Sequence, residues 1–134
     1  MDKELSKKQK EEILDYFGRM VIENVRDRSL DISMKIASYT TINPLKLKQY
    51  ESFAALSEEE RETVCDLLSE TISDTIFNFL HMFEDYSDNM KITITKDGKE
   101  HNLIDISEVL GGEIAFQDED GWIQKFSKIG RPTF

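Results

Sequence analysis

Three side chains in the second half of the chain have types and spacing that could support chemistry. His81 precedes Glu84 by three residues and Asp85 by four, so on a helix the three would lie beside one another. Such a trio could hold a divalent metal or pair an acid with a base, which makes a small metal-dependent or acid/base enzyme the alternative hypothesis. A metal centre needs three or four converging ligands, and the other histidine, His101, stands alone in a predicted strand. We therefore predict no metal, no cofactor and no catalytic residue.

Three other motifs have simpler structural explanations. The segment Asp118–Gly121 resembles part of a calcium loop, but Ile129 occupies the twelfth position of such a loop, so a hairpin turn is predicted instead. Cys65 has acidic neighbours in sequence, which disfavour a thiolate nucleophile, and it is predicted to lie in the core. Gly111 and Gly112 lack the strand and helix that flank a phosphate-binding loop and are interpreted as turn residues.

The acidic residues are concentrated in one part of the chain. The formal net charge of the 134 residues is −10, and residues 51–90 contain 11 acidic side chains against a single basic one, Arg61. The segments on either side, 1–50 and 91–134, are nearly balanced. A field of this sign repels phosphate groups, so direct binding to nucleic acid or to an anionic membrane is not expected, and a basic protein partner is favoured.

A stripe of like charges follows the predicted long helix. Glu62, Asp66, Glu70 and Asp74 are four residues apart, and each uncompensated pair of this kind costs about 0.2–0.5 kcal/mol. One interpretation is that Lys7, Lys8 and Lys10, or simply water and salt, compensate these charges. The other is that the stripe binds a basic protein surface, with Phe77 as an apolar anchor. On this interpretation the predicted site comprises Glu62, Asp66, Glu70, Asp74, Phe77, His81, Glu84 and Asp85.

Four helical segments are predicted before residue 88. A capping box at Ser6 and Gln9 opens a helix over about 7–26, in which Gly18 is explained by close packing against another helix. Residues 28–42 fit either a strand or a helix, and helix is preferred. Asn43-Pro44 begins a short helix that ends near residue 55. A second capping box at Ser57 opens a helix over about 58–85, whose predicted core stripe comprises Val64, Leu68, Ile72, Ile76, Phe79 and Phe83.

After residue 88 the apolar period changes from helical to alternating. Strands are predicted at about 90–96 and 99–106 around the turn Lys96–Lys99, followed by a turn-like winding at 107–112. A second hairpin is predicted from strands at 113–117 and 122–126. The predicted fold is thus α+β, in which the helices of residues 1–88 pack on a four-stranded antiparallel sheet of two hairpins within residues 89–128. Residues 129–134 are predicted to form a tail, and residues 1–134 a single domain.

These patterns favour a small acidic, non-enzymatic protein-binding module, such as an inhibitor, an immunity-type protein or an adaptor. An acidic DNA mimic is a variant of the same class. A helix-turn-helix regulator within residues 28–75 is disfavoured because its recognition helix would be acidic. The charged start of the sequence and the lack of a long apolar run lead us to expect a cytoplasmic protein with no membrane contact. Formation of a homodimer stays open, because edge strands could pair.

Overall fold

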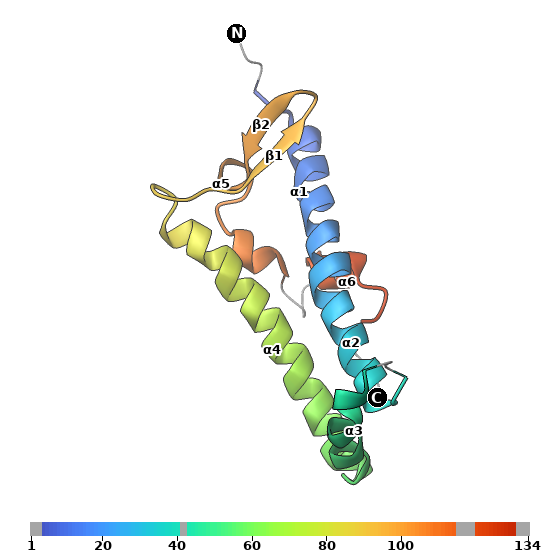
Figure 1. Cartoon of the computed structure of the whole chain (residues 1–134). Helices are drawn as coiled ribbons and strands as arrows, with labels where there is room; N and C mark the ends of the chain where they lie inside the picture. The colour runs from blue at the N-terminus through green and yellow to red at the C-terminus, as the bar shows by residue number, and fades with distance from the viewer. Residues whose placement is uncertain (1–3, 41–42, 115–119, 131–134) are drawn as a thin grey trace.

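Two long helical segments dominate the architecture. The computed structural model describes residues 4–40, 43–114 and 120–130. One segment joins α1 (Lys7–Val21), η1 (Ile22–Asp27) and α2 (Arg28–Ala37), and the other is α4 (Glu58–Asp85). In Figure 1 the two segments approach each other at the end that carries α3 (Leu47–Ala54) and diverge toward a small β-hairpin. The remaining short elements are η2 (Pro44–Lys46), β1 (Thr93–Lys96), β2 (Lys99–Asn102), α5 (Leu103–Ile106), η3 (Leu110–Ile114) and α6 (Trp122–Phe126).

The first helical segment confirms the predicted start and resolves the ambiguous region. The Ser6 hydroxyl accepts a hydrogen bond from the Gln9 amide at 3.1 Å, and the Gln9 side chain accepts one from the Ser6 amide at 2.9 Å, which completes the capping box. Residues 28–37 are helical, so the preference for helix over strand is confirmed as far as Ala37. Between them η1 is a π-helix, in which the consecutive residues Arg26 and Asp27 are both buried.

The third and fourth predicted helix starts are also confirmed. The Asn43 side chain accepts a hydrogen bond from the Leu45 amide at 3.1 Å, and Pro44 opens the short η2 turn before α3. The predicted long helix is α4, with both ends at the predicted residues. Its first turn is fixed by the Ser57 hydroxyl, which accepts from the Glu60 amide at 3.1 Å, and by Glu60, which accepts from the Ser57 amide at 3.0 Å.

The predicted four-stranded sheet of two hairpins is wrong. Within the described residues the sheet has two strands, β1 and β2, paired antiparallel with Ile94 opposite His101. Its predicted turn is confirmed, because Asp97 and Gly98 both have positive φ, at 54° and 77°. The strand predicted over 99–106 ends at Asn102 and continues as the helical turn α5.

The second predicted hairpin is replaced by helical turns where it can be described. Residues 113–114 belong to η3, residues 115–117 lie outside the described part of the chain, and residues 122–126 form α6. The neighbours Trp122 and Ile123 are 1% and 2% exposed, which a strand with one covered face cannot achieve because its successive side chains point to opposite sides. The apolar residues Trp122, Ile123 and Phe126 fit a helical turn as well as a strand, so the sequence pattern was ambiguous.

The core fills the space between the long segments and explains Gly18. A Cβ atom on Gly18 would lie 2.5 Å from Cε2 and Nε1 of Trp122, so the predicted close packing against another helix is confirmed, with α6 as that helix. Cys65 is buried, as predicted. The buried cluster comprises Ile13, Ile22, Ile76, Leu80, Leu103, Leu110, Ile114, Trp122 and Ile123.

The apolar stripe predicted for α4 is only partly correct. Ile76 is buried, but Phe79 is 56% exposed, and Leu80, which the stripe omitted, is 1% exposed. The buried line of α4 therefore runs on the Ile76 and Leu80 side, where η3 packs against the helix. A single helix offers several faces, and the position of its neighbours decides which face is covered.

Candidate functional site

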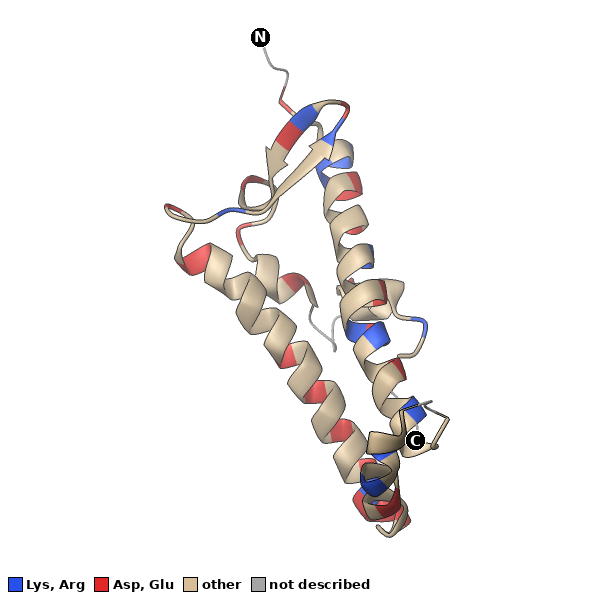
Figure 2. Ribbon diagram, viewed as in Figure 1, with Lys and Arg blue, Asp and Glu red and all other residues tan. Residues whose placement is uncertain are grey.

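Most of the acidic stripe lies on the exposed side of α4. Figure 2 shows these residues as a row on the helix. Glu62, Glu70 and Asp74 are exposed, Asp66 is half-buried, and within the described residues no lysine, arginine or histidine forms an ion pair with Glu62, Glu70 or Asp74. We use the name acidic α4 face for Glu62, Asp66, Glu70, Asp74, Phe77, His81, Glu84 and Asp85.

The structure does not place the lysines of the first helix next to the beginning of this stripe. Lys7, Lys8 and Lys10 belong to the first turn of α1, which lies beside the hairpin, whereas α4 begins at the opposite end beside α3 (Figures 1 and 2). A helix of 28 residues is about 42 Å long, so the two ends are far apart. The sequence suggested that either these lysines or water and salt compensate the charge of Glu62. Of these two, water and salt remain.

An exposed leucine belongs to the same face and was missed in the sequence. Leu67, Glu70, Asp74, Phe77 and His81 are spaced by three or four residues, so they fall within about 80° of one another around the helix axis. Leu67 is 62% exposed and Phe77 is 39% exposed. The helical spacing of Leu67 from Glu70 and Asp74 could have shown from the sequence that the leucine shares a face with these acidic residues. The face therefore combines negative charge with two apolar side chains.

The predicted trio of His81, Glu84 and Asp85 is brought together at the end of this face. The Glu84 carboxylate forms a hydrogen bond with Nδ1 of His81, and Asp85 Oδ2 lies 3.6 Å from Nε2. The hydrogen bond to Glu84 raises the pKa of His81 above its ordinary value, and the charge of Asp85 acts in the same direction. The ring of Phe77 stacks on the imidazole, with centroids 5.6 Å apart and planes 13° apart.

Gly111 holds η3 close to this part of α4. A Cβ atom at Gly111 would lie 3.1 Å from the Phe77 carbonyl oxygen and 3.4 Å from the His81 amide nitrogen. Gly111 does not have a positive φ, so the reason for glycine is close approach to the α4 backbone and not the turn geometry that the sequence suggested. The back of the acidic α4 face is thereby fixed against the core.

The structure does not combine the two histidines into one site. His101 lies on β2 and lines a cavity between the hairpin and the start of α1, and His81 is not among its lining residues. In the described part of the chain no group of three or more His, Cys, Asp or Glu residues has an arrangement that could hold a metal ion. The histidine of the acidic α4 face is therefore left with two carboxylates from its own helix.

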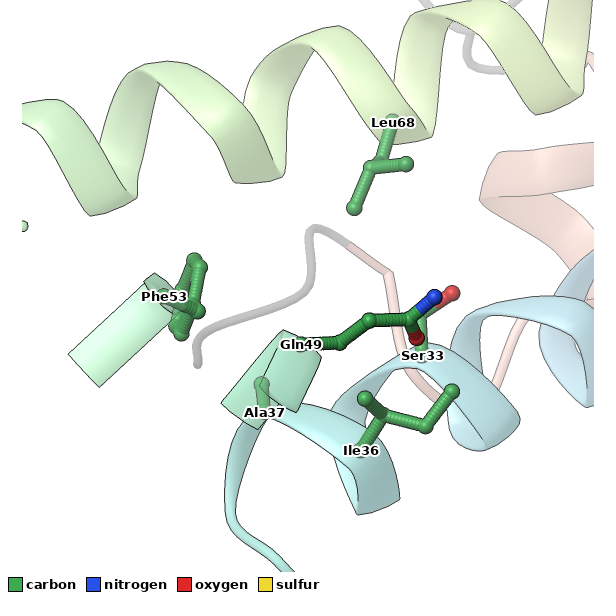
Figure 3. Close-up of a pocket in the computed structure, with 6 residues that line it drawn as sticks. All are labelled: Ser33, Ile36, Ala37, Gln49, Phe53 and Leu68. Atoms are coloured by element: carbon green, nitrogen blue, oxygen red, sulfur yellow. The ribbon is translucent and has the colours of Figure 1, made fainter. Parts of the chain in front are cut away.

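A second cavity lies at the other end of the molecule. It has a volume of about 260 Å³ and opens between α2, α3 and α4 (Figure 3). Among the described residues its lining carries no titratable side chain, and the Ser33 hydroxyl in it donates to the Ser29 carbonyl oxygen at 3.2 Å. The lining offers no pair of an acid and a base. It comprises Ser33, Ile36, Ala37, Gln49, Phe53 and Leu68.

A buried ionic network was not predicted from the sequence. Arg26 is fully buried, and its guanidinium donates to Asp27 at 2.8 Å and to the Gly130 carbonyl oxygen at 2.6 Å. Asp27 accepts from the Ser127 hydroxyl and from the Lys128 amide, both at 2.8 Å. The network attaches residues 127–130, of which 129 and 130 were expected to begin the tail, to η1. Arg26 is four residues from Ile22 and four from Leu30, both of which are buried, so all three lie on one face of a helix. This spacing could have indicated from the sequence that Arg26 is buried.

Comparison with known proteins identifies no relative. No family model matches the chain, and neither a curated protein nor a solved structure matches it. Among the described helices, none combines the length and the apolar character that crossing a bilayer requires.

Proposed function

We propose that this chain is a small acidic, non-enzymatic protein-binding module that attaches to a basic protein surface through the acidic α4 face. An inhibitor, an immunity-type protein and an adaptor all fit this description, as does a mimic of DNA that occupies a basic groove. We propose that it works in the reducing cytoplasm, where the single cysteine, Cys65, would stay a thiol. The observation that carries the proposal is that three carboxylates of this face, those of Glu62, Glu70 and Asp74, are exposed and form no ion pair with a cationic side chain within the described residues.

The energetics of this row favour a partner of opposite charge. Adjacent carboxylates on one helix face repel each other by a few tenths of a kcal/mol per pair. A basic surface would relieve that repulsion on contact and would also be attracted from a distance, which raises the rate of association. Leu67 and Phe77 lie among the charges and would give the contact an apolar centre.

The test is capture of a partner from native lysate at low and moderate salt, followed by mapping of its binding site. The variant carries Glu62→Lys, Glu70→Lys and Asp74→Lys, three exposed residues of the face. The matched control carries Glu100→Lys, Asp105→Lys and Glu108→Lys, which are also exposed and make the same change in net charge away from α4.

The proposal predicts that the wild type and the control capture the same basic protein, that salt releases it, and that the α4 variant loses it. Amide hydrogen exchange should then show protection of α4 in the purified complex. Equal capture by all three proteins would refute the role of α4, because net charge alone or another surface would then explain the binding.

A further inference from the structure

His81 stands in a position where its own protonation changes the charge that the face presents. Both ring nitrogens are directed at carboxylates, Nδ1 at Glu84 and Nε2 at Asp85. A neutral imidazole carries a single N–H group, so only the imidazolium can serve both carboxylates at once. The stacked ring of Phe77 also favours the cation, because its face is negative.

Within the described residues, the ion pairs of His81 are those with Glu84 and Asp85. On η3, the element packed beside His81, the titratable side chain is Glu113, which accepts from the Ser107 hydroxyl at 2.8 Å. The segments that meet α4 nearer its start are η1 and α2. Their charged groups are the exposed Arg28 and the Glu23–Lys128, Arg26–Asp27 and Asp31–Lys35 pairs. The ionic state of the trio is therefore set mainly within α4.

We propose that His81 is a proton-operated regulator of the acidic α4 face, which binds a basic partner more weakly when His81 is protonated. The imidazolium then occupies Glu84 and Asp85 and cancels one of the negative charges. When His81 is neutral, its single N–H can still serve Glu84, whose side chain is only 14% exposed, whereas Asp85, at 58% exposed, is available to the lysine or arginine side chains of a partner. This inference rests on the proposed function, since it concerns the strength of binding at the same face.

The location of His81 supports a direct effect on binding. It shares one side of the helix with Glu70, Asp74 and Phe77, and its side chain is about half exposed, so it would lie within the contact. Histidine is the side chain whose ordinary pKa lies in the physiological range, and lysines of a partner stay charged throughout that range. A pH change between about 6 and 8.5 would then change the charge of His81 and leave that of the partner lysines unchanged.

The experiment uses the full chain and a capped, fluorescent hexalysine peptide as the basic probe, at low ionic strength. Affinity is measured by anisotropy at about pH 6 and about pH 8.5, and amide chemical-shift changes record where the peptide binds. Three proteins are compared, namely the wild type, His81→Gln and His101→Gln. The last is the matched control, because it removes the other histidine at a place outside the acidic α4 face.

We expect the peptide to perturb α4 amides and to bind the wild type about two- to fivefold more tightly at the higher pH, the range that one exposed ion pair supports. His81→Gln should bind equally at both pH values, and His101→Gln should behave like the wild type. Wild-type binding at α4 that does not change with pH would overturn the regulatory role and leave the proposed function standing. The absence of binding at α4 at both pH values would overturn both.

Discussion

Replacement of Gly18 by alanine tests the most closely packed contact in the core. The new Cβ atom would lie 2.5 Å from Cε2 and Nε1 of Trp122 and 2.7 Å from Cδ1. The Trp122 side chain is almost completely buried, and it lies on a short helix packed against α1. A contact this short forces something to shift, and because the buried ring is held on α6, we expect α6 to move away from α1.

The expected magnitude follows from two opposing effects. Restoring an ordinary contact of 3.4 Å requires a shift of about 0.9 Å from 2.5 Å, and overpacking of this kind costs about 1–3 kcal/mol. Alanine is favoured over glycine within a helix by up to about 1 kcal/mol. We therefore expect Gly18→Ala to lower the free energy of unfolding, by as much as about 2 kcal/mol.

Urea unfolding followed by fluorescence measures this change directly, because Trp122 is the only tryptophan of the chain and reports on the contact itself. Gly112→Ala is the matched control. Its Cβ atom would meet nothing closer than Val109 at 3.8 Å, so its stability should change little. A Gly18→Ala protein that is as stable as the wild type, with unchanged tryptophan emission, would refute the packing argument.

Three further predictions concern the ionic network, the helix cap and η3. Asp27→Ala leaves the buried Arg26 guanidinium without its carboxylate and should lower the free energy of unfolding in urea by about 3 kcal/mol. Asp31→Ala, which removes the exposed pair with Lys35, should lower it by less than about 0.5 kcal/mol. Equal effects of the two substitutions would contradict a stabilising role for the buried pair. Hydrogen bonds from the Ser57 amide and hydroxyl lower the pKa of Glu60. The ionised Glu60 carboxylate should therefore stabilise the protein fully above the ordinary pKa of glutamate, and this stabilisation should disappear as the pH falls through the lowered pKa. Stability measured across the acid range should therefore depend less on pH in Glu60→Ala, and an unchanged pH profile would exclude the cap as the cause. Gly111→Ala brings a Cβ atom to 3.1 Å from a backbone carbonyl oxygen of α4 and should cost about 1 kcal/mol, and a gain in thermal stability would show that η3 can move away.

Local sequence signals were sufficient for the starts of α1, η2 and α4. The capping boxes at Ser6 and Ser57 and the Asn43-Pro44 start each place a side-chain oxygen near a free backbone amide, so these starts are favoured by residues only a few positions apart. The turn at Asp97-Gly98 is local in the same sense. The acidic stripe was also readable, because the spacing of side chains along a helix is fixed by its geometry.

The second hairpin could not be resolved by local patterns. Short apolar runs such as Trp122–Phe126 satisfy both periods, and the choice between strand and helix depends on what the run packs against. Here the notch at Gly18 accepts the Trp122 ring, so both Trp122 and its neighbour Ile123 are buried together. That arrangement needs a helical turn.

The sequence by itself determined where α1, η2 and α4 begin, where the charge lies and which residues share a face of α4, because each of these depends on neighbours a few positions apart. Only the tertiary structure decided that Arg26 and Asp27 are buried, that Leu80 and not Phe79 enters the core, and that the first lysines lie far from Glu62. These outcomes depend on contacts between segments up to about a hundred residues apart, such as Arg26 with Ser127. Burial is a property of the assembled surfaces, and no local spacing specifies it.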